Sequence, residues 1–222
     1  MKTTSTLLLL ALACPVFAVR VDTGGSIVVN QGLFTLVSQS VTFNFNDGLL
    51  PSANGITYTG ATTNVVTGNI SGVTAAPPND TSAYLTIGPA RGASVTITSA
   101  YALDYLGFYV GSLDAFNYID LYMGNSLVAA LTGTQIATIG GFPANGDQGR
   151  GIYVNIYSSS SAEHFNRIVM RSTSNALESD NHAFRAVNRS STTVVDSPVP
   201  EPASALLLIP ALVWMARKRA SR

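Results

Sequence analysis

Apolar and polar residues alternate in short segments along the body of the chain, with the period of two that half-buried strands show. Val41, Phe43 and Phe45 alternate with polar residues, and so do Val95 and Ile97. Gly, Pro, Asn and Asp punctuate the segments, and no helical pattern of ten residues lies between the two ends of the chain. The predicted strands cover residues 26–30, 33–37, 41–45, 83–87, 93–98, 106–110, 117–123, 152–156, 164–171 and 182–187. This pattern predicts an all-β fold, a single jelly-roll-like β-sandwich.

The densest apolar segment lies in the middle of the chain. Leu106, Phe108 and Val110 alternate on one strand and are predicted to face the core. Tyr105 and Tyr109 fall on the opposite face of that strand. There they would either fill the sandwich and its rim with the hydroxyl groups in water, or form an exposed row that stacks against sugar rings.

Charge narrows the range of partners. The 222-residue chain has a net charge of zero, but residues 19–197 contain seven Arg, no Lys and eleven Asp or Glu, which gives 7 − 11 = −4. An acidic body without Lys argues against nucleic-acid binding, which depends on clustered cations. The only cysteine is Cys14, so a mature form that begins after it has no disulfide bond.

The N-terminus has the three parts of a secretory signal peptide over residues 1–18. Lys2 is its positive residue, residues 7–13 form its apolar region, and Val16 and Ala18 occupy the −3 and −1 positions. Signal peptidase is therefore expected to cut between Ala18 and Val19. The alternative is a lipoprotein leader cut before Cys14.

The C-terminus combines a proline-flanked acid, an apolar run and a basic end. The triplet Pro200, Glu201 and Pro202 precedes the apolar run 203–216, and the basic residues are Arg217, Lys218, Arg219 and Arg222. As a helix the run would be about 21 Å long, which is short for a hydrocarbon core of about 30 Å. Weak anchoring or a buried hydrophobic helix are the alternative interpretations. Residues 189–198 form a polar tether between this signal and the predicted domain, residues 19–188.

The tail resembles the PEP-CTERM sorting signal of Gram-negative bacteria over residues 199–222. The resemblance implies export by the Sec machinery, transient insertion into the inner membrane as a hydrophobic sorting helix, and cleavage by an exosortase near the triplet. The stretch GFYVGSLDAFNYIDLY is similar to the central hairpin of a family of exosortase-dependent surface proteins, and that likeness covers roughly residues 100–185. The implied location is the cell surface or the extracellular matrix.

Catalytic motifs are missing from the sequence. His164 and His182 are predicted to be half-exposed strand residues, and neither belongs to a metal-binding pair. The glycine-rich segment 140–151 precedes a strand, whereas a phosphate-binding loop precedes a helix. Six carboxylates could support glycoside hydrolysis, but nothing in the sequence singles out a pair among Asp104, Asp114, Asp120, Glu163, Glu178 and Asp180.

A structural calcium ion is the one cofactor that the sequence raises. Glu178, Asp180 and Asn181 lie in a predicted loop between the last two strands, and their oxygens are of the kind that Ca²⁺ prefers. Asn46 and Asp47 form a second candidate cluster. Capping of turns by Asp and Asn explains both clusters without an ion.

These observations predict a non-enzymatic surface or matrix protein with a structural or adhesive role in exopolysaccharide or biofilm. The first alternative is a carbohydrate-binding module, and the second is a secreted polysaccharide-acting hydrolase. A pair of carboxylates in a cleft would favour the hydrolase, and exposed tyrosines on a concave face would favour sugar binding.

Overall fold

The computed structural model describes residues 19–187, which form strands, one short α-helix and two 3₁₀ turns, Thr62–Asn64 and Ser161–Glu163. The first strands are β1 (Arg20–Thr23), β2 (Ser26–Val28), β3 (Gly32–Phe34), β4 (Val41–Phe43), β5 (Ser52–Ala53), β6 (Ile56–Thr59) and β7 (Val65–Thr67). The later ones are β8 (Ala83–Ile87), β9 (Ser94–Gly111), β10 (Asn117–Met123), β11 (Ser126–Thr132), β12 (Gly151–Tyr157), β13 (Phe165–Ser172) and β14 (Leu177–Ala186). The prediction of an all-β, sandwich-like fold is confirmed.

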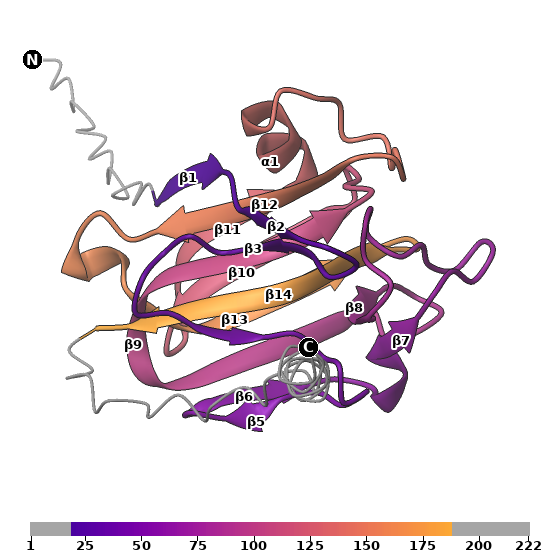
Figure 1. Cartoon of the computed structure of the whole chain (residues 1–222). Helices are drawn as coiled ribbons and strands as arrows, with labels where there is room; N and C mark the ends of the chain where they lie inside the picture. Colours follow the sequence, from indigo (N-terminus) through magenta and orange to yellow (C-terminus); the bar gives the residue numbers. More distant parts are fainter. Residues whose placement is uncertain (1–18, 188–222) are drawn as a thin grey trace, which may run out of the picture. The chain divides into compact units, whose positions relative to one another are not determined.

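Strand β9 is the element around which the other strands are arranged (Figure 1). Its first half pairs with β13 on one side and β6 on the other, and its second half pairs with β12 and β14. All of these pairings are antiparallel. The sequence pattern predicts two separate strands here, but no glycine or proline interrupts residues 94–106, so the backbone continues from one layer into the other.

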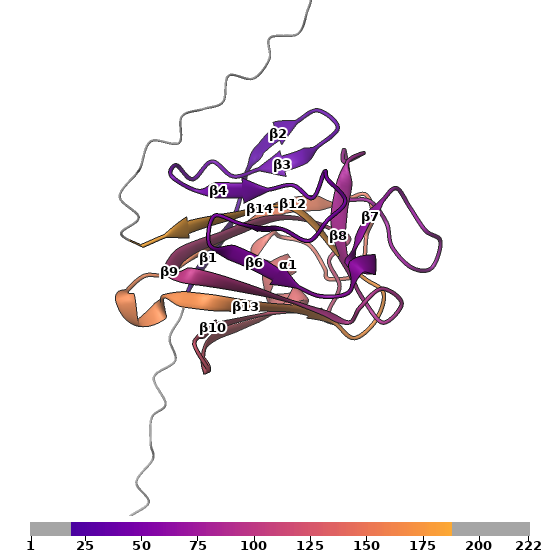
Figure 2. The same ribbon diagram turned by 90° about the horizontal axis from the view of Figure 1, so that it is seen from below.

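The two layers enclose one hydrophobic core. One layer has the order β1–β12–β9–β14–β8–β7, and the other has the order β11–β10–β13–β9–β6–β5. Figure 2 shows β12 and β14 lying above β13 and β10. Leu106, Phe108 and Val110 are buried in the core cluster, as the alternation predicts. Val95 and Ile97 join the same cluster from the first half of β9.

The outer face of the β12–β9–β14 layer is also buried, which the sequence pattern does not predict. The short β2–β3 pair lies over it, as Figure 1 shows. Gly32 allows the closest approach: its φ is +73°, and a Cβ atom there would overlap the Tyr109 ring. Asn181 fixes the same segment by donating from Nδ2 to the carbonyl oxygens of Gln31, at 2.6 Å, and Leu33, at 3.0 Å.

Helix α1 (Gly133–Ile139) follows β11 directly. Thr132 and Gln135 form a capping box, in which the threonine hydroxyl accepts from the Gln135 backbone N–H and the glutamine side chain accepts from the Thr132 N–H. The sequence signal for this helix is the Thr-x-x-Gln spacing. Ile136 and Ala137 bury one face of the helix against the sandwich.

Strand β14 begins five residues earlier than the predicted strand 182–187. Glu178 pairs across the sheet with Thr86 on one side and Gly111 on the other. The expectation that Glu178, Asp180 and Asn181 lie in a loop is therefore wrong. Pairing with two neighbouring strands outweighs the weak β propensity of these polar residues.

Candidate functional site

A polar pocket of about 430 Å³ opens at one end of the sandwich. Ser112, which directly follows β9, and Glu178, near the start of β14, line it, and the rest of its wall comes from the segments 69–75, 145–146 and 175–176 together with Asp114 and Gln148. Its volume lies in the usual range for small-molecule sites. Four side-chain amides line it, those of Asn69, Asn145, Gln148 and Asn175.

Glu178 forms the buried floor of this pocket and is only 2% exposed. Its Oε1 accepts a hydrogen bond of 3.0 Å from the Ala75 backbone N–H, and its Oε2 accepts one of 2.6 Å from the Ser112 hydroxyl. Burial raises the pKa of Glu178, and the negative charge of Asp114 raises it further, while these hydrogen bonds act in the opposite direction. Glu178 therefore ties two walls of the pocket together.

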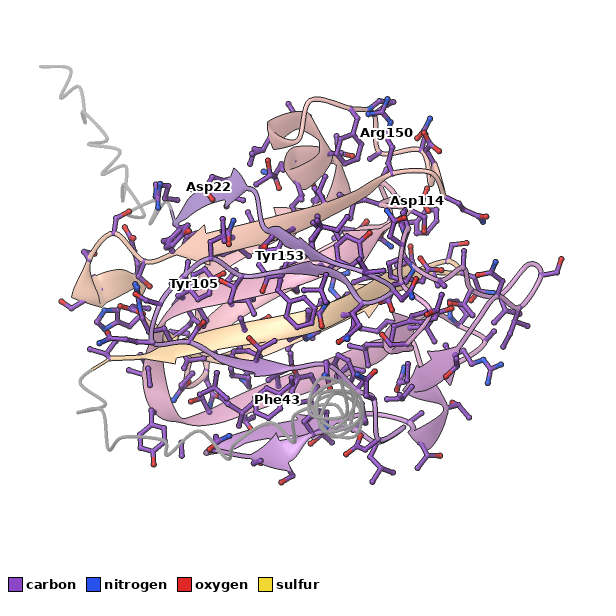
Figure 3. All side chains as sticks on the ribbon, in the orientation of Figure 1. Asp22, Phe43, Tyr105, Asp114, Arg150 and Tyr153 are labelled. Atoms are coloured by element: carbon purple, nitrogen blue, oxygen red, sulfur yellow. The ribbon has the colours of Figure 1, made fainter. Side chains whose placement is uncertain are left out.

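Asp114 is the second carboxyl group of the pocket, and it lies on the connection between β9 and β10 (Figure 3). It is half-buried, and burial raises its pKa. Within residues 19–187 no hydrogen bond or ion pair reaches its carboxylate. Gly146 makes room for it: a Cβ atom there would lie 2.8 Å from Asp114 Oδ2.

Both carboxylates are among the six that the sequence offers for glycoside hydrolysis, but the sequence does not indicate that these two lie in one pocket. Asp114 and Glu178 are brought together only by the loop connections at one end of the sandwich, and no local spacing signals that arrangement. The other four carboxylates on the same footing, Asp104, Asp120, Glu163 and Asp180, do not line the pocket. Asp104 and Asp120 instead bind Arg185 and Arg171, at 2.8 and 3.2 Å.

The pocket can exchange hydrogen bonds with a ligand rich in hydroxyl groups. Its amides offer both donors and acceptors, Ser71 and Ser112 add hydroxyls, and the two carboxyl groups add strong acceptors. This differs from the mostly apolar lining that is common in small-molecule sites.

No family model matches the chain, and no curated protein is significantly similar to it.

Asp180 and Asn181, two of the predicted calcium ligands, lie deep under the β2–β3 cover. Asp180 Oδ1 accepts a 2.7 Å hydrogen bond from the Asn181 N–H. The Ser82 hydroxyl lies 3.3 Å from Asp180 Oδ2 and 2.5 Å from Asp80 Oδ1, so one hydroxyl joins two buried carboxyl groups. Glu178 is bound by other partners, as described above, and so the three predicted ligands do not share one set of contacts.

Calcium binding here stays a prediction. Within residues 19–187, no group of three or more His, Cys, Asp or Glu side chains is placed to hold a metal ion. The second candidate cluster forms a turn, in which Asp47 Oδ1 accepts from the Leu49 N–H at 3.0 Å. Burial is the main cause that raises the pKa of Asp180 to about 9, and the charge of Asp80 adds to it.

Replacing Asp180 by Asn should make the protein more resistant to urea at pH 8 than the wild type. The folded-state pKa of about 9 lies above the usual unfolded value of about 3.9. The unfolded chain therefore ionises first, and the folded state loses stability as the pH rises from about 4 to about 9. The neutral amide removes this loss, so the difference between the urea midpoints should shrink toward pH 4.

Asp47→Asn removes a charge from an exposed turn and should leave the pH profile unchanged. A bound calcium ion would instead make the wild type more stable than Asp180→Asn, because the ion would stabilise the ionised carboxylates of Asp80 and Asp180. In that case added Ca²⁺ would raise the wild-type midpoint but not that of Asp180→Asn. A wild type that is more stable than Asp180→Asn at pH 8 in the presence of a chelator would contradict this account.

Of the two alternatives for Tyr105 and Tyr109, the exposed stacking row is wrong, and the structure shows that both rings fill the interior of the domain. They are 0% and 2% exposed. The Tyr105 hydroxyl is 2.7 Å from both Asn155 Oδ1 and Thr35 Oγ1, and the Tyr109 hydroxyl donates to the Pro78 carbonyl. Thr35 contacts Tyr105, whereas Gly32 and Pro78 contact Tyr109, so both tyrosines pack inside the domain.

His182 is also fully buried, where the sequence pattern predicts half-exposure. Its Nε2 lies 2.9 Å from Ser179 Oγ, and its Nδ1 lies 2.9 Å from the Tyr58 hydroxyl. Burial lowers its pKa to about 3, so the imidazole is neutral at physiological pH. The arrangement resembles a catalytic relay only in composition, because these core side chains are closed to any substrate. His164 is half-exposed.

Most of the predicted processing residues lie outside the described residues. This holds for Ala18, for the triplet Pro200, Glu201 and Pro202, and for the basic end Arg217, Lys218, Arg219 and Arg222. Val19, on the other side of the predicted signal-peptidase cut, is half-buried beside β1. Within residues 19–187, no helix is long and apolar enough to cross a membrane.

Proposed function

We propose that this chain is an exported surface or matrix protein whose sandwich domain binds a saccharide of the extracellular matrix. The observation that carries the binding part is the pocket, where amides, hydroxyls and two carboxyl groups line one cavity. Sugars present many hydroxyl groups, and such groups are bound best where donors and acceptors are already in place. The pocket is also built largely from loops on a rigid scaffold, where binding sites tend to lie.

The export part rests on the two ends of the sequence. A leader over residues 1–18 and the triplet, apolar run and basic end of residues 199–222 resemble the signals for Sec export and exosortase cleavage. Signal peptidase and the exosortase would be transient partners, with brief insertion into the inner membrane between the two cuts. The protein is then a substrate of that machinery, and its body is left at the cell surface or in the exopolysaccharide.

We also infer that the sandwich is a jelly roll. The strands from β8 onward pair as a nested hairpin: β8 with β14, the first half of β9 with β13, the second half with β12, and β10 with β11. A long antiparallel hairpin that is wound over two layers gives the double Greek key of jelly rolls. In this topology the pocket lies at one end, among the connections between layers.

Hydrolysis of a polysaccharide is the second candidate, because two carboxyl groups share the pocket. Glycosidases need one protonated and one ionised carboxyl group, and their environments push the two pKa values apart. Burial raises the pKa of both Asp114 and Glu178, and both oxygens of Glu178 already accept hydrogen bonds. The pair therefore suits binding better than catalysis.

Affinity electrophoresis tests the binding. A gel that contains exopolysaccharide from the native host should slow the migration of the full chain, which is solubilised in mild detergent. The double variant Asn145→Ala and Gln148→Ala should bind about thirtyfold more weakly, because two hydrogen bonds are lost and each contributes roughly 1 kcal/mol. Both residues are exposed in the pocket wall, so the fold should not suffer.

Asn125→Ala, on the exposed β10–β11 turn outside the pocket, is the matched control and should bind like the wild type. Equal retention of the double variant would place binding elsewhere on the molecule. Release of new reducing ends from the polysaccharide would instead favour the hydrolase.

A further inference from the structure

The charge of the pocket limits which saccharides it can accept. Two carboxyl groups line it, and no Lys, Arg or His stands among its lining residues. Arg150 lies at the same end of the domain (Figure 3), but it is ion-paired with Asp147 at 3.3 Å. It also lies over the Phe142 ring, with its Cζ atom 5.7 Å from the ring centroid. The pocket therefore presents uncompensated negative charge.

Asp114 is the group that a ligand can reach. Both carboxylate oxygens of Glu178 accept hydrogen bonds, one from Ala75 and one from Ser112. The Asp114 carboxylate receives no hydrogen bond or ion pair from the described part of the chain. A half-buried carboxylate without a partner loses part of its hydration and gains nothing in return. A ligand that brings a positive charge to Asp114 would offset that loss.

The negative charge of the pocket should make its affinity depend strongly on the charge of the saccharide. Uronic-acid, sulfated or phosphorylated saccharides would be repelled by the two carboxyl groups. Neutral saccharides could use the amides and hydroxyls but would leave the charge of Asp114 unpaired. A saccharide with ammonium groups complements both features, because it offers hydroxyl groups to the amides and a charge-assisted hydrogen bond to the carboxylate.

We propose that the pocket selects an amino sugar with free ammonium groups, and that Asp114 binds the ammonium group while the surrounding amides bind the hydroxyl groups. This inference rests on the proposed saccharide-binding function and specifies its ligand. Glu178 acts as a positioning residue, since it holds the Ala75 loop and Ser112 in place around the ligand.

Calorimetric titration of the full chain in mild detergent at pH 6 tests the proposal. The probes are a glucosamine hexamer, its N-acetylated counterpart and a uronate hexamer with and without calcium. The glucosamine hexamer should bind about tenfold more tightly than the N-acetylated one, because hydrogen bonds to charged groups are stronger than neutral ones. The preference should weaken as salt is added.

Asp114→Asn should abolish the preference for the glucosamine hexamer and leave weak, equal binding of both hexamers. Asp47→Asn, which removes the same charge from an exposed turn outside the pocket, should keep it. A preference that survives in Asp114→Asn would overturn the proposal, and so would equal or tighter binding of the N-acetylated or uronate hexamer to the wild type. Those outcomes leave the proposed function standing, whereas absence of binding to the host polysaccharide and to all three probes would remove both.

Discussion

Truncating Phe108 to alanine should lower the free energy of unfolding by about 3–5 kcal/mol. The ring is fully buried in the core cluster on β9, and it meets His182 edge-on with centroids 5.9 Å apart. Removing it takes away apolar burial and leaves a cavity between the two layers. Total stabilities are about 5–15 kcal/mol, and the described domain contains no cysteine that could form a disulfide bond. Urea denaturation followed by fluorescence would measure the loss.

Leu127→Ala is the matched control, because Leu127 is an apolar strand residue on β11 that is 55% exposed. Its replacement should change stability by less than about 0.5 kcal/mol. Tyr109→Ala should also be damaging, although the residue lies on the opposite face of β9 from Phe108. Tyr109 is buried under Gly32 and donates to the Pro78 carbonyl. If Phe108→Ala and Leu127→Ala had equal midpoints, the core would be placed wrongly.

Replacing Pro200, Glu201 and Pro202 together by alanine should stop processing and leave the full-length chain in the membrane fraction. The apolar run is short, so it can hold the chain in the membrane only for a time. The resemblance implies that the exosortase recognises the triplet, so without the triplet the chain should stay uncut. Immunoblots of membrane and extracellular fractions from the native host would measure the effect.

A three-residue alanine replacement at Ser190, Ser191 and Thr192, in the tether, changes the same length of chain without touching the triplet. It should be processed like the wild type. Trimming and release of the triplet variant at the wild-type level would show that the tail is not read as a sorting signal.

The alternation of apolar residues was enough to predict the core face of the central strand. Leu106, Phe108 and Val110 are buried as expected, because period-two patterning depends only on local geometry. The same pattern could not predict that the other face of the strand is buried too. That burial depends on residues 24–36, which approach through the backbone of glycine and through carbonyl oxygens rather than through a recognisable side-chain pattern.

For a related reason, the sequence pattern predicts a loop where the buried polar residues of β14 lie in a strand. Glu178, Asp180 and Asn181 have the composition of a loop, yet they lie in a strand between β9 and β8. Their polar groups are accommodated by partners far away in the sequence, such as Ala75, Ser82 and Gln31. Local propensity contains no information about such partners, and strand propensity yields to tertiary context.

The sequence reveals the types of residue that line the pocket but not that they come together in one cavity. The sequence offered six carboxylates, abundant amides and a glycine-rich segment before a strand, and the last of these was correctly assigned to a loop. The convergence of Asp114 and Glu178 follows from where the connections between layers meet. Side-chain composition predicted a secreted β protein, whereas the polar cavity became visible only with the topology.

We propose that the chain is exported and cut at both ends, which would leave the sandwich outside the cell. Intact-mass measurement of the protein recovered from its native host would detect both cleavages in one experiment. We expect a polypeptide that begins at Val19 and ends near Pro200–Pro202, with any excess mass due to an attached group. Recovery of the uncut chain of 23.2 kDa would contradict it.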